Sequence, residues 1–283
     1  MDVFICTNDE QLIGAKVSKF LLISSNYFKE HEIKIINEKD FEILNLLKGK
    51  KFLRSNKISI YDPNDMQNFT LLRFAIPELL EYKNNALVID PDIFFIGGDP
   101  LAKIKYIEEC DLLCRPGNNS GTHATSLMFL NCANLRSWRL EKIVEGLLDH
   151  TIDYNDLINL KDTSLRIKKL DKKWNDFDSL DDETIFLHTT QKVTQPWRKG
   201  LPLNSFIPPI FGFIQRDLIY KIFKKPLRIG VDHPKREVSD FFFRSLNKAI
   251  ENNFISRNEM LRFVNKGYVR QDIFNILDEL PMN

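Results

Sequence analysis

The sequence lacks any long apolar run and any strong excess of charge. No segment of the 283 residues approaches the roughly 18 apolar residues that a transmembrane helix needs. The first ten residues, MDVFICTNDE, have neither the basic start nor the apolar core of a secretory signal. Forty basic and thirty-nine acidic residues leave a net charge of +1, which favours neither nucleic acid nor an anionic membrane. We therefore expect a cytoplasmic protein without a transmembrane segment and without a nucleic-acid partner.

Cysteine is also scarce, which excludes a small domain stabilised mainly by disulfide bonds. The four cysteines are Cys6, Cys110, Cys114 and Cys132. One C-x3-C pair occurs, but no second pair has the spacing of a zinc site. Two of the four lie inside apolar runs, where a thiol behaves as a small hydrophobic group. We expect four buried thiols in a reducing compartment.

Hydrophobic periodicity is what the sequence has in abundance, and it predicts alternating strands and helices. We expect strands at residues 2–6, 32–36, 86–90, 110–114, 125–131 and 184–188. We expect helices at residues 11–24, 40–47, 68–82, 134–149, 239–253, 256–267 and 271–281. Pro77 should kink the third of these, because its ring clashes with the preceding turn.

This alternation indicates an α/β fold with a mixed sheet flanked by helices, because helices between strands return the chain along the sheet. Residues 86–89 of the strand at 86–90 are all apolar, as in a central strand buried on both faces. Helical segments dominate after residue 238. We assign residues 1–205 to a catalytic domain and residues 206–283 to a C-terminal helical extension packed on it.

Two aspartates lie at the carboxyl end of the strand at 86–90, in the triplet Asp90-Pro91-Asp92. Side chains two residues apart at a strand end point to the same side, and two close carboxylates repel unless a cation lies between them. Mn²⁺ or Mg²⁺ suits such oxygen ligands and can also hold a diphosphate. Such a triplet is common by chance, and the aspartates could instead cap a turn. A second triplet, Asp176-Phe177-Asp178, lies in a polar run that we expect to be a solvated loop.

His188 ends another apolar run, and Lys192 follows it. A histidine nitrogen beside two carboxylates would favour Mn²⁺ over Mg²⁺, since nitrogen ligands suit the softer ion. Lys192 could then meet phosphate oxygens as a point charge. A histidine at a strand end can equally be a core residue held by hydrogen bonds.

The sequence resembles the metal-dependent glycosyltransferases of GT-A fold, in particular glycosyltransferase family 8 and its bacterial relatives. The resemblance is carried by the segments FTLLRFAIPELL and ALVIDPDIFFIGGDPL, the later His188 and the segment QPW. The resemblance covers about residues 1–200. It implies a Rossmann-like mixed sheet and a nucleotide-diphosphate sugar as donor, with uracil as the expected base. It also implies a hexosyltransferase-like enzyme that transfers the sugar to a glycan, lipid or other acceptor with retention of configuration.

The resemblance further implies roles for individual residues. The metal would be bound by Asp90, Asp92 and His188. The nucleotide would be contacted by Thr7, Asn8, Arg73, Asp90 and Trp197. The candidate catalytic residues are Lys192, Asn131 and Asn175. The chain departs from the family in HTTQKV, which lacks the usual glycine, and in Gln195, which replaces a lysine before Pro-Trp. Trp174 beside Asn175 could form a sugar platform or belong to the core.

Two other functions fit parts of the pattern. A haloacid-dehalogenase-like phosphatase also places a nucleophilic Asp after an apolar strand, but its motif opens the chain, whereas Asp90 does not. A non-catalytic nucleotide- or sugar-binding scaffold of the same fold would share the whole site. Residues 221–236 are rich in Lys and Arg and could face an anionic glycan or a lipid headgroup as a peripheral membrane contact, or be a solvated surface. We expect His233 to be structural.

Overall fold

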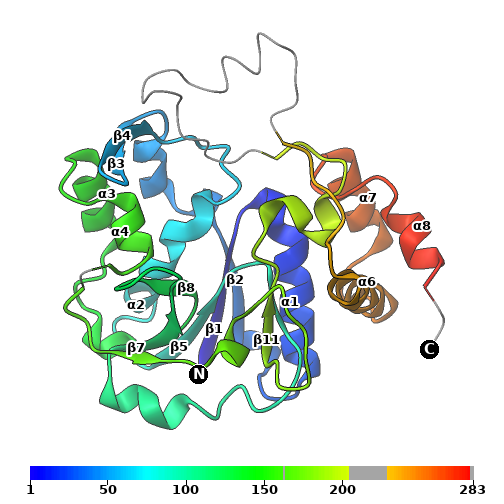
Figure 1. The fold of residues 1–283 in the computed structure, drawn as a ribbon, viewed down its shortest axis with the longest axis horizontal. Helices are drawn as coiled ribbons and strands as arrows, with labels where there is room; N and C mark the ends of the chain where they lie inside the picture. The colour runs from blue at the N-terminus through cyan, green and yellow to red at the C-terminus, as the bar shows by residue number, and fades with distance from the viewer. Residues whose placement is uncertain (162, 204–227, 281–283) are drawn as a thin grey trace.

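The computed structural model describes residues 1–161, 163–203 and 228–280. Its centre is a six-stranded mixed sheet with the order β2-β1-β5-β8-β7-β9 (Figure 1). The strands are β1 Asp2–Thr7, β2 Ile33–Asn37, β5 Asn85–Ile89, β7 Leu112–Pro116, β8 His123–Asn131 and β9 Ile167–Lys169. β8 runs antiparallel to β5 and β7, whereas the other neighbouring pairs are parallel. The start of β8 therefore lies at the same edge as the ends of β1 and β5.

Both faces of this sheet are buried. In β1, Phe4 and Cys6 belong to one hydrophobic cluster, and Val3 and Ile5 belong to another on the opposite face. The first face is covered by α3 (Leu140–Leu148) and neighbouring segments, and the second by α1 (Leu12–Ser24). Strands covered on both sides need apolar residues at successive positions, which is why these segments lack polar alternation.

A second, three-stranded sheet follows the Asp-Pro-Asp triplet. It has the order β10-β11-β6 and consists of β6 Ile93–Phe95, β10 Asp176–Phe177 and β11 Phe186–His188. β6 and β11 are antiparallel, with His188 opposite Ile93. The triplet is thus the corner where the chain leaves β5 and enters β6. This register brings Asp92 and His188 together.

Helix α1 packs closely against that corner. A Cβ atom on Gly14 would lie 2.5 Å from the carbonyl oxygen of Pro91 and 3.1 Å from the Trp197 ring. Only a hydrogen fits between the helix and the corner, so glycine permits this approach.

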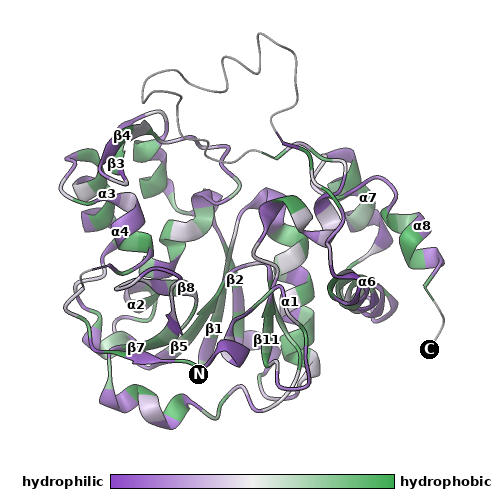
Figure 2. Ribbon diagram, in the orientation of Figure 1, coloured by the Kyte–Doolittle hydropathy of each residue, from purple (hydrophilic) through white to green (hydrophobic). Residues whose placement is uncertain are grey.

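The last helices described are α6 (Arg236–Glu251), α7 (Arg257–Asn265) and α8 (Ile273–Asp278). α6 packs against α1, and α8 packs against α6 (Figure 1). Because α1 lies between these helices and the sheet, it is apolar on two sides. Figure 2 shows α1 mostly in the hydrophobic colours and α6 mostly in the hydrophilic ones. The three predicted C-terminal helices are confirmed, and Ser256 caps α7 by accepting a hydrogen bond from the Glu259 N–H at 3.1 Å. The proposed domain boundary at residues 205/206 lies outside the described residues.

Several predicted helices are shorter or tighter than expected. Residues 40–47 form 3-10 turns, and residues 68–82 divide into a 3-10 helix and the short α2 (Ile76–Leu79). Pro77 lies in the first turn of α2, so the predicted kink is wrong: a missing N–H is tolerated where no helical partner exists. The other short helix is α4 (Tyr154–Ile158). The 3-10 helices are Asp9–Gln11, Glu30–Glu32, Glu38–Asp40, Glu42–Leu47, Asn68–Phe74, Ile104–Glu109, Cys132–Asn134, Lys172–Trp174, Lys192–Thr194 and Pro196–Arg198.

The sequence patterns did not reveal the hairpin of β3 (Lys51–Arg54) and β4 (Lys57–Ile60). Its two turn residues, Ser55 and Asn56, have φ of 53° and 58°, as in a type I′ turn without the usual glycine. The four cysteines are buried free thiols, as predicted, and burial raises the pKa of Cys114 to about 12. No helix within residues 1–161, 163–203 and 228–280 has the length and apolar character to cross a membrane.

Candidate functional site

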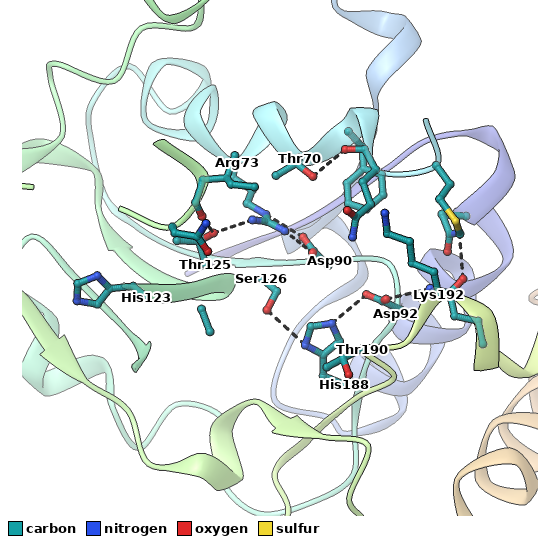
Figure 3. Close-up of a pocket in the computed structure, with 18 residues that line it drawn as sticks. Thr70, Arg73, Asp90, Asp92, His123, Thr125, Ser126, His188, Thr190 and Lys192 are labelled. Atoms are coloured by element: carbon teal, nitrogen blue, oxygen red, sulfur yellow. Dashed lines mark hydrogen bonds and ion pairs between the residues drawn. The ribbon is translucent and has the colours of Figure 1, made fainter. Parts of the chain in front are cut away.

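A cavity of about 210 Å³ opens where β5 ends and β8 begins (Figure 3). Asp92, His188 and Lys192 lie on one side of it and His123 on the other (Figure 3). The Asn159 carbonyl accepts a hydrogen bond from the His123 N–H. The cavity also receives side chains from the segment before α2 and from the loop after β11. They are Gln11, Met66, Gln67, Phe69, Thr70, Arg73, Asp90, Ala124, Thr125, Ser126, Ile158, Thr190 and Gln195. It lies at the sheet edge where open α/β sheets bind ligands.

Asp90 is engaged by Arg73 rather than free. Arg73 donates from Nε to Asp90 Oδ1 at 2.9 Å and from Nη2 to Asp90 Oδ2, and its Nη1 donates to Thr125 Oγ1 at 2.7 Å. Both residues are buried. Burial raises the pKa of Asp90, and the guanidinium opposes that rise. The structure therefore places Asp90 in an ion pair, where each of its oxygens already accepts one hydrogen bond and keeps one further lone pair.

Asp92 has one satisfied and one unsatisfied oxygen. Its Oδ2 accepts a hydrogen bond from Gln195 Nε2 at 2.9 Å. Its Oδ1 is buried and has no hydrogen-bond partner. Burial raises the pKa of Asp92 to about 6, so the carboxyl is mostly ionised at neutral pH. A buried, ionised oxygen without a partner is costly unless a cation approaches it.

His188 faces that oxygen with a fixed tautomer. Asn175 donates from Nδ2 to Ser126 Oγ at 3.0 Å, which turns its carbonyl oxygen towards His188. His188 Nδ1 lies 2.9 Å from Asn175 Oδ1, so Nδ1 carries the proton and Nε2 keeps a lone pair. Burial lowers the pKa of His188 to about 4, so the ring is neutral. Nε2 lies 3.5 Å from Asp92 Oδ1, with no proton to share between them at neutral pH.

The pair of Asp92 Oδ1 and His188 Nε2 fits a divalent cation. Two ligands each about 2.1 Å from one ion lie about 3.0 to 3.5 Å apart when they subtend a right or tetrahedral angle. A metal-bound histidine also donates its other ring N–H to a fixed acceptor, as His188 does to Asn175. Across the described parts of the chain, no three His, Cys, Asp or Glu side chains converge as a metal-binding group. The remaining ligands would have to come from water or a bound molecule.

Lys192 is half-buried at the same end of the cavity, with Nζ 3.9 Å from Asp65 Oδ1. Burial lowers the pKa of its ammonium. A poorly solvated ammonium gains more than an exposed one from an anionic ligand.

Asn131 lies at the opposite edge of the sheet from the cavity. It pairs with Asn85 at the start of β5, whereas the end of β5 pairs with Leu127. Its side chain donates to the backbone carbonyl of Ile107. Because β8 is antiparallel to β5, the residues that reach the cavity are those that begin β8. The sequence patterns missed Thr125 and Ser126 for that reason.

The structure places three more predicted residues outside the cavity. Trp197 is fully buried in the cluster between α1 and α6, with its ring 4.8 Å from that of Phe242. Thr7 is buried at the end of β1. Asn8 is held by three hydrogen bonds, including its donation to Asn68 Oδ1 at 2.7 Å, and lines a separate hollow. Trp174 is a core residue packed on Phe129.

The second aspartate triplet is not the solvated loop that we expected. Asp176 is buried in β10, and Asp178 accepts a hydrogen bond from the Thr190 N–H at 3.0 Å. Buried His233 lies 3.2 Å from Asp178 through Nε2, in keeping with its expected structural role. Of the basic residues between 221 and 236, Lys221, Lys224 and Lys225 lie outside the described residues, and Arg228, Lys235 and Arg236 are exposed.

No protein-family model matches the sequence, and no curated protein matches it. Solved structures similar to this chain include the galactosyltransferase LgtC in complex with donor and acceptor sugar analogs, at 14% identity over 70% of this chain and 89% of LgtC, with a TM-score of 0.45. Glycosyltransferase GlyE from Streptococcus pneumoniae TIGR4 has 15% identity over 81% of this chain and 64% of its own, with a TM-score of 0.45. Mouse xyloside xylosyltransferase 1 has 10% identity over 67% and 97%, with a TM-score of 0.44. The predicted fold class, a mixed α/β sheet flanked by helices, is confirmed.

Proposed function

We propose that this protein is a glycosyltransferase that holds the diphosphate of a nucleotide sugar through a divalent cation bound by Asp92 and His188. The observation that carries this proposal is that Asp92 Oδ1 and His188 Nε2, which both have a free lone pair, lie 3.5 Å apart in a polar cavity. A cation with two protein ligands keeps positions for phosphate oxygens. The resemblance of the sequence motifs to glycosyltransferase family 8 supports sugar transfer from a UDP-sugar to a carbohydrate or glycolipid acceptor.

The nitrogen ligand favours Mn²⁺ over Mg²⁺. When bound, the cation would neutralise the charge that develops on the leaving diphosphate. Lys192 would add a second positive charge at the same end of the cavity. Gln195 orients Asp92 and accepts a hydrogen bond from Gln11 Nε2 at 3.1 Å, which links the carboxylate to the segment after β1.

A nucleotide-binding protein without turnover is the second candidate. It is favoured by the Arg73–Asp90 ion pair, because a carboxylate whose oxygens already accept hydrogen bonds from a guanidinium is a weaker ligand for a cation. The same pair argues against the phosphatase, because that reaction needs Asp90 as a free nucleophile.

Calorimetric titration of UDP into the whole protein, with and without Mn²⁺, tests the proposal. We expect binding in the presence of Mn²⁺ and at least 10-fold weaker binding without it, because the diphosphate would then lie beside the Asp92 carboxylate with no cation between the like charges. Turnover of UDP-sugars in the same buffer distinguishes the enzyme from the scaffold. Absence of binding by UDP and then by GDP would contradict both candidates.

Asn175→Ala should weaken Mn²⁺-dependent UDP binding by about 10- to 100-fold, because the loss of the acceptor that fixes a histidine ligand has effects of this size. His188 would lose the nearer partner of Nδ1, the one that can only accept, and would keep Ser126 Oγ at 3.3 Å, whose hydroxyl can either donate or accept. Asn131→Ala is the matched control, since this asparagine lies at the far edge of the sheet. Equal UDP affinities for the two variants would show that Asn175 does not position a ligand. Circular dichroism checks that both variants fold.

A further inference from the structure

Gln11 has a buried side-chain oxygen without a hydrogen-bond donor. It follows β1 and lines the cavity together with Gln195 and Asp92, and it is only 1% exposed. Its Nε2 donates to Gln195 Oε1 at 3.1 Å, but its Oε1 meets no donor among the described residues. A buried amide oxygen that is left unsatisfied costs free energy, which a ligand with a suitable donor would recover.

The charge of Asp92 determines which way the two glutamine amides point. An ionised carboxylate can only accept, so Gln195 must present its Nε2 to Asp92 Oδ2, where it donates at 2.9 Å. The carbonyl oxygen of Gln195 then faces Gln11, which must answer with its own Nε2. The Oε1 atom of Gln11 is therefore the end of a chain of hydrogen bonds that begins at a carboxylate. It can act only as an acceptor.

The ligand group that meets Gln11 must carry a proton. Phosphate oxygens are acceptors, so the diphosphate itself does not satisfy Oε1. The cation would lie at Asp92 Oδ1, whereas the two glutamines are linked to Asp92 through Oδ2, on its other oxygen. In a nucleotide sugar, the groups joined directly to the diphosphate are two sugar rings, the ribose and the transferred sugar. Both carry hydroxyls, which can donate to an amide oxygen.

We infer that Gln11 is a specificity-determining residue whose Oε1 accepts a hydrogen bond from a hydroxyl of a sugar ring joined to the bound diphosphate. This inference rests on the proposed function, because the cation at Asp92 would hold the diphosphate. A buried acceptor of this kind discriminates against ligands that lack the hydroxyl, since it is then left unpaired. The ring is the ribose or the transferred sugar, and ligands that differ in these rings distinguish the two.

Three variants test this role. Gln11→Met removes the amide and keeps nearly the same length, and Gln11→Asn keeps the amide but withdraws its oxygen by one methylene. Gln271→Met makes the first change at an exposed position just before α8 and is the matched control. Calorimetry with Mn²⁺ present would measure the affinities of the parent and the variants for UDP, 2′-deoxy-UDP, 3′-deoxy-UDP, UDP-glucose, UDP-galactose and UDP-N-acetylglucosamine. Circular dichroism checks that each variant folds.

For a contact with the ribose, we expect Gln11→Met to bind UDP about 10-fold more weakly, as for the loss of one buried hydrogen bond. It should bind one of the deoxy nucleotides as the parent does. For a contact with the transferred sugar, UDP affinity should be unchanged, and the UDP-sugar that the parent prefers should bind about 10-fold more weakly. Gln11→Asn should show the same pattern, and Gln271→Met should bind every ligand as the parent does.

An equal loss for all six ligands would overturn the inference, because Gln11 would then only support Asp92 through Gln195. Unchanged affinities in both Gln11 variants would overturn it as well. So would a parent that binds all six ligands equally well, a result that needs no variant to fold. A parent that binds no UDP in the presence of Mn²⁺ would instead contradict the proposed function.

Discussion

Asp92→Ala is expected to abolish the Mn²⁺-dependent part of UDP binding, a loss of at least about 100-fold in affinity, since a ligand of the ion matters more than the groups that position it. Asp92 provides the buried oxygen that has no partner in the protein. Without it, His188 Nε2 would be a lone nitrogen ligand for the cation. Calorimetric titration of UDP in the presence of Mn²⁺ measures the effect.

Two further variants make this experiment specific. Asp92→Asn keeps the size of the side chain and removes its charge, so it should bind almost as poorly as Asp92→Ala. Asp149→Ala removes an exposed aspartate after α3 and should bind UDP as the parent does. Retention of Mn²⁺-dependent binding by Asp92→Ala would show that the cation lies elsewhere or is not needed.

Arg73→Met is expected to lower the free energy of unfolding by about 3 to 5 kcal/mol, the typical cost of removing one partner from a buried ion pair. Asp90 would keep its charge at a buried position and lose its two hydrogen bonds from Arg73. Urea unfolding followed by circular dichroism measures the change. The double variant Arg73→Met/Asp90→Leu should regain most of the loss, because replacing both partners by apolar groups can be nearly neutral.

The effect of Arg73→Met should also depend on pH. Burial already raises the pKa of Asp90, and the guanidinium that opposes this rise would be gone. A carboxyl with a higher pKa in the folded than in the unfolded state binds protons more tightly when folded. The variant should therefore become more stable as the pH falls from above the folded pKa towards the unfolded value near 4. The difference in free energy of unfolding between the parent and Arg73→Met should shrink between pH 8 and about pH 5. A constant difference over this range would contradict the ion-pair explanation.

The sequence was sufficient to predict the central strands and part of the cavity. Apolar runs such as 86–89 are unambiguous because both faces of the sheet are covered, and the two aspartates after that run do reach the cavity. His188 and Lys192, predicted from the end of a later apolar run, also line it. Hydrophobic periodicity shows where a strand ends, and the ends of β5 and β11 both lie at the cavity.

Strand direction and pairing partners were beyond such reasoning. Nothing in the run at 125–131 shows that β8 is antiparallel to β5. The resemblance selects Asn131 at the end of this run, whereas Ser126, near its start, lines the cavity. The partner of Asp90 is equally hidden, since Arg73 reaches it from a 3-10 helix that the patterns predict as part of a long α-helix. Trp197 is predicted to contact the nucleotide but packs against Phe242 of α6, a contact that no local pattern reveals.

The corner between the two sheets has a consequence for how the chain responds to its ligands. Asp92 and Gln195, which hydrogen-bond to each other, are 103 residues apart in sequence, and His188 comes from the same distant part of the chain. Closing so large a loop is entropically unfavourable, so the unfolded ensemble does not present these groups together. An ion or nucleotide bound there therefore binds only the native state. By mass action, a higher ligand concentration raises the melting temperature and the denaturant concentration at the unfolding midpoint.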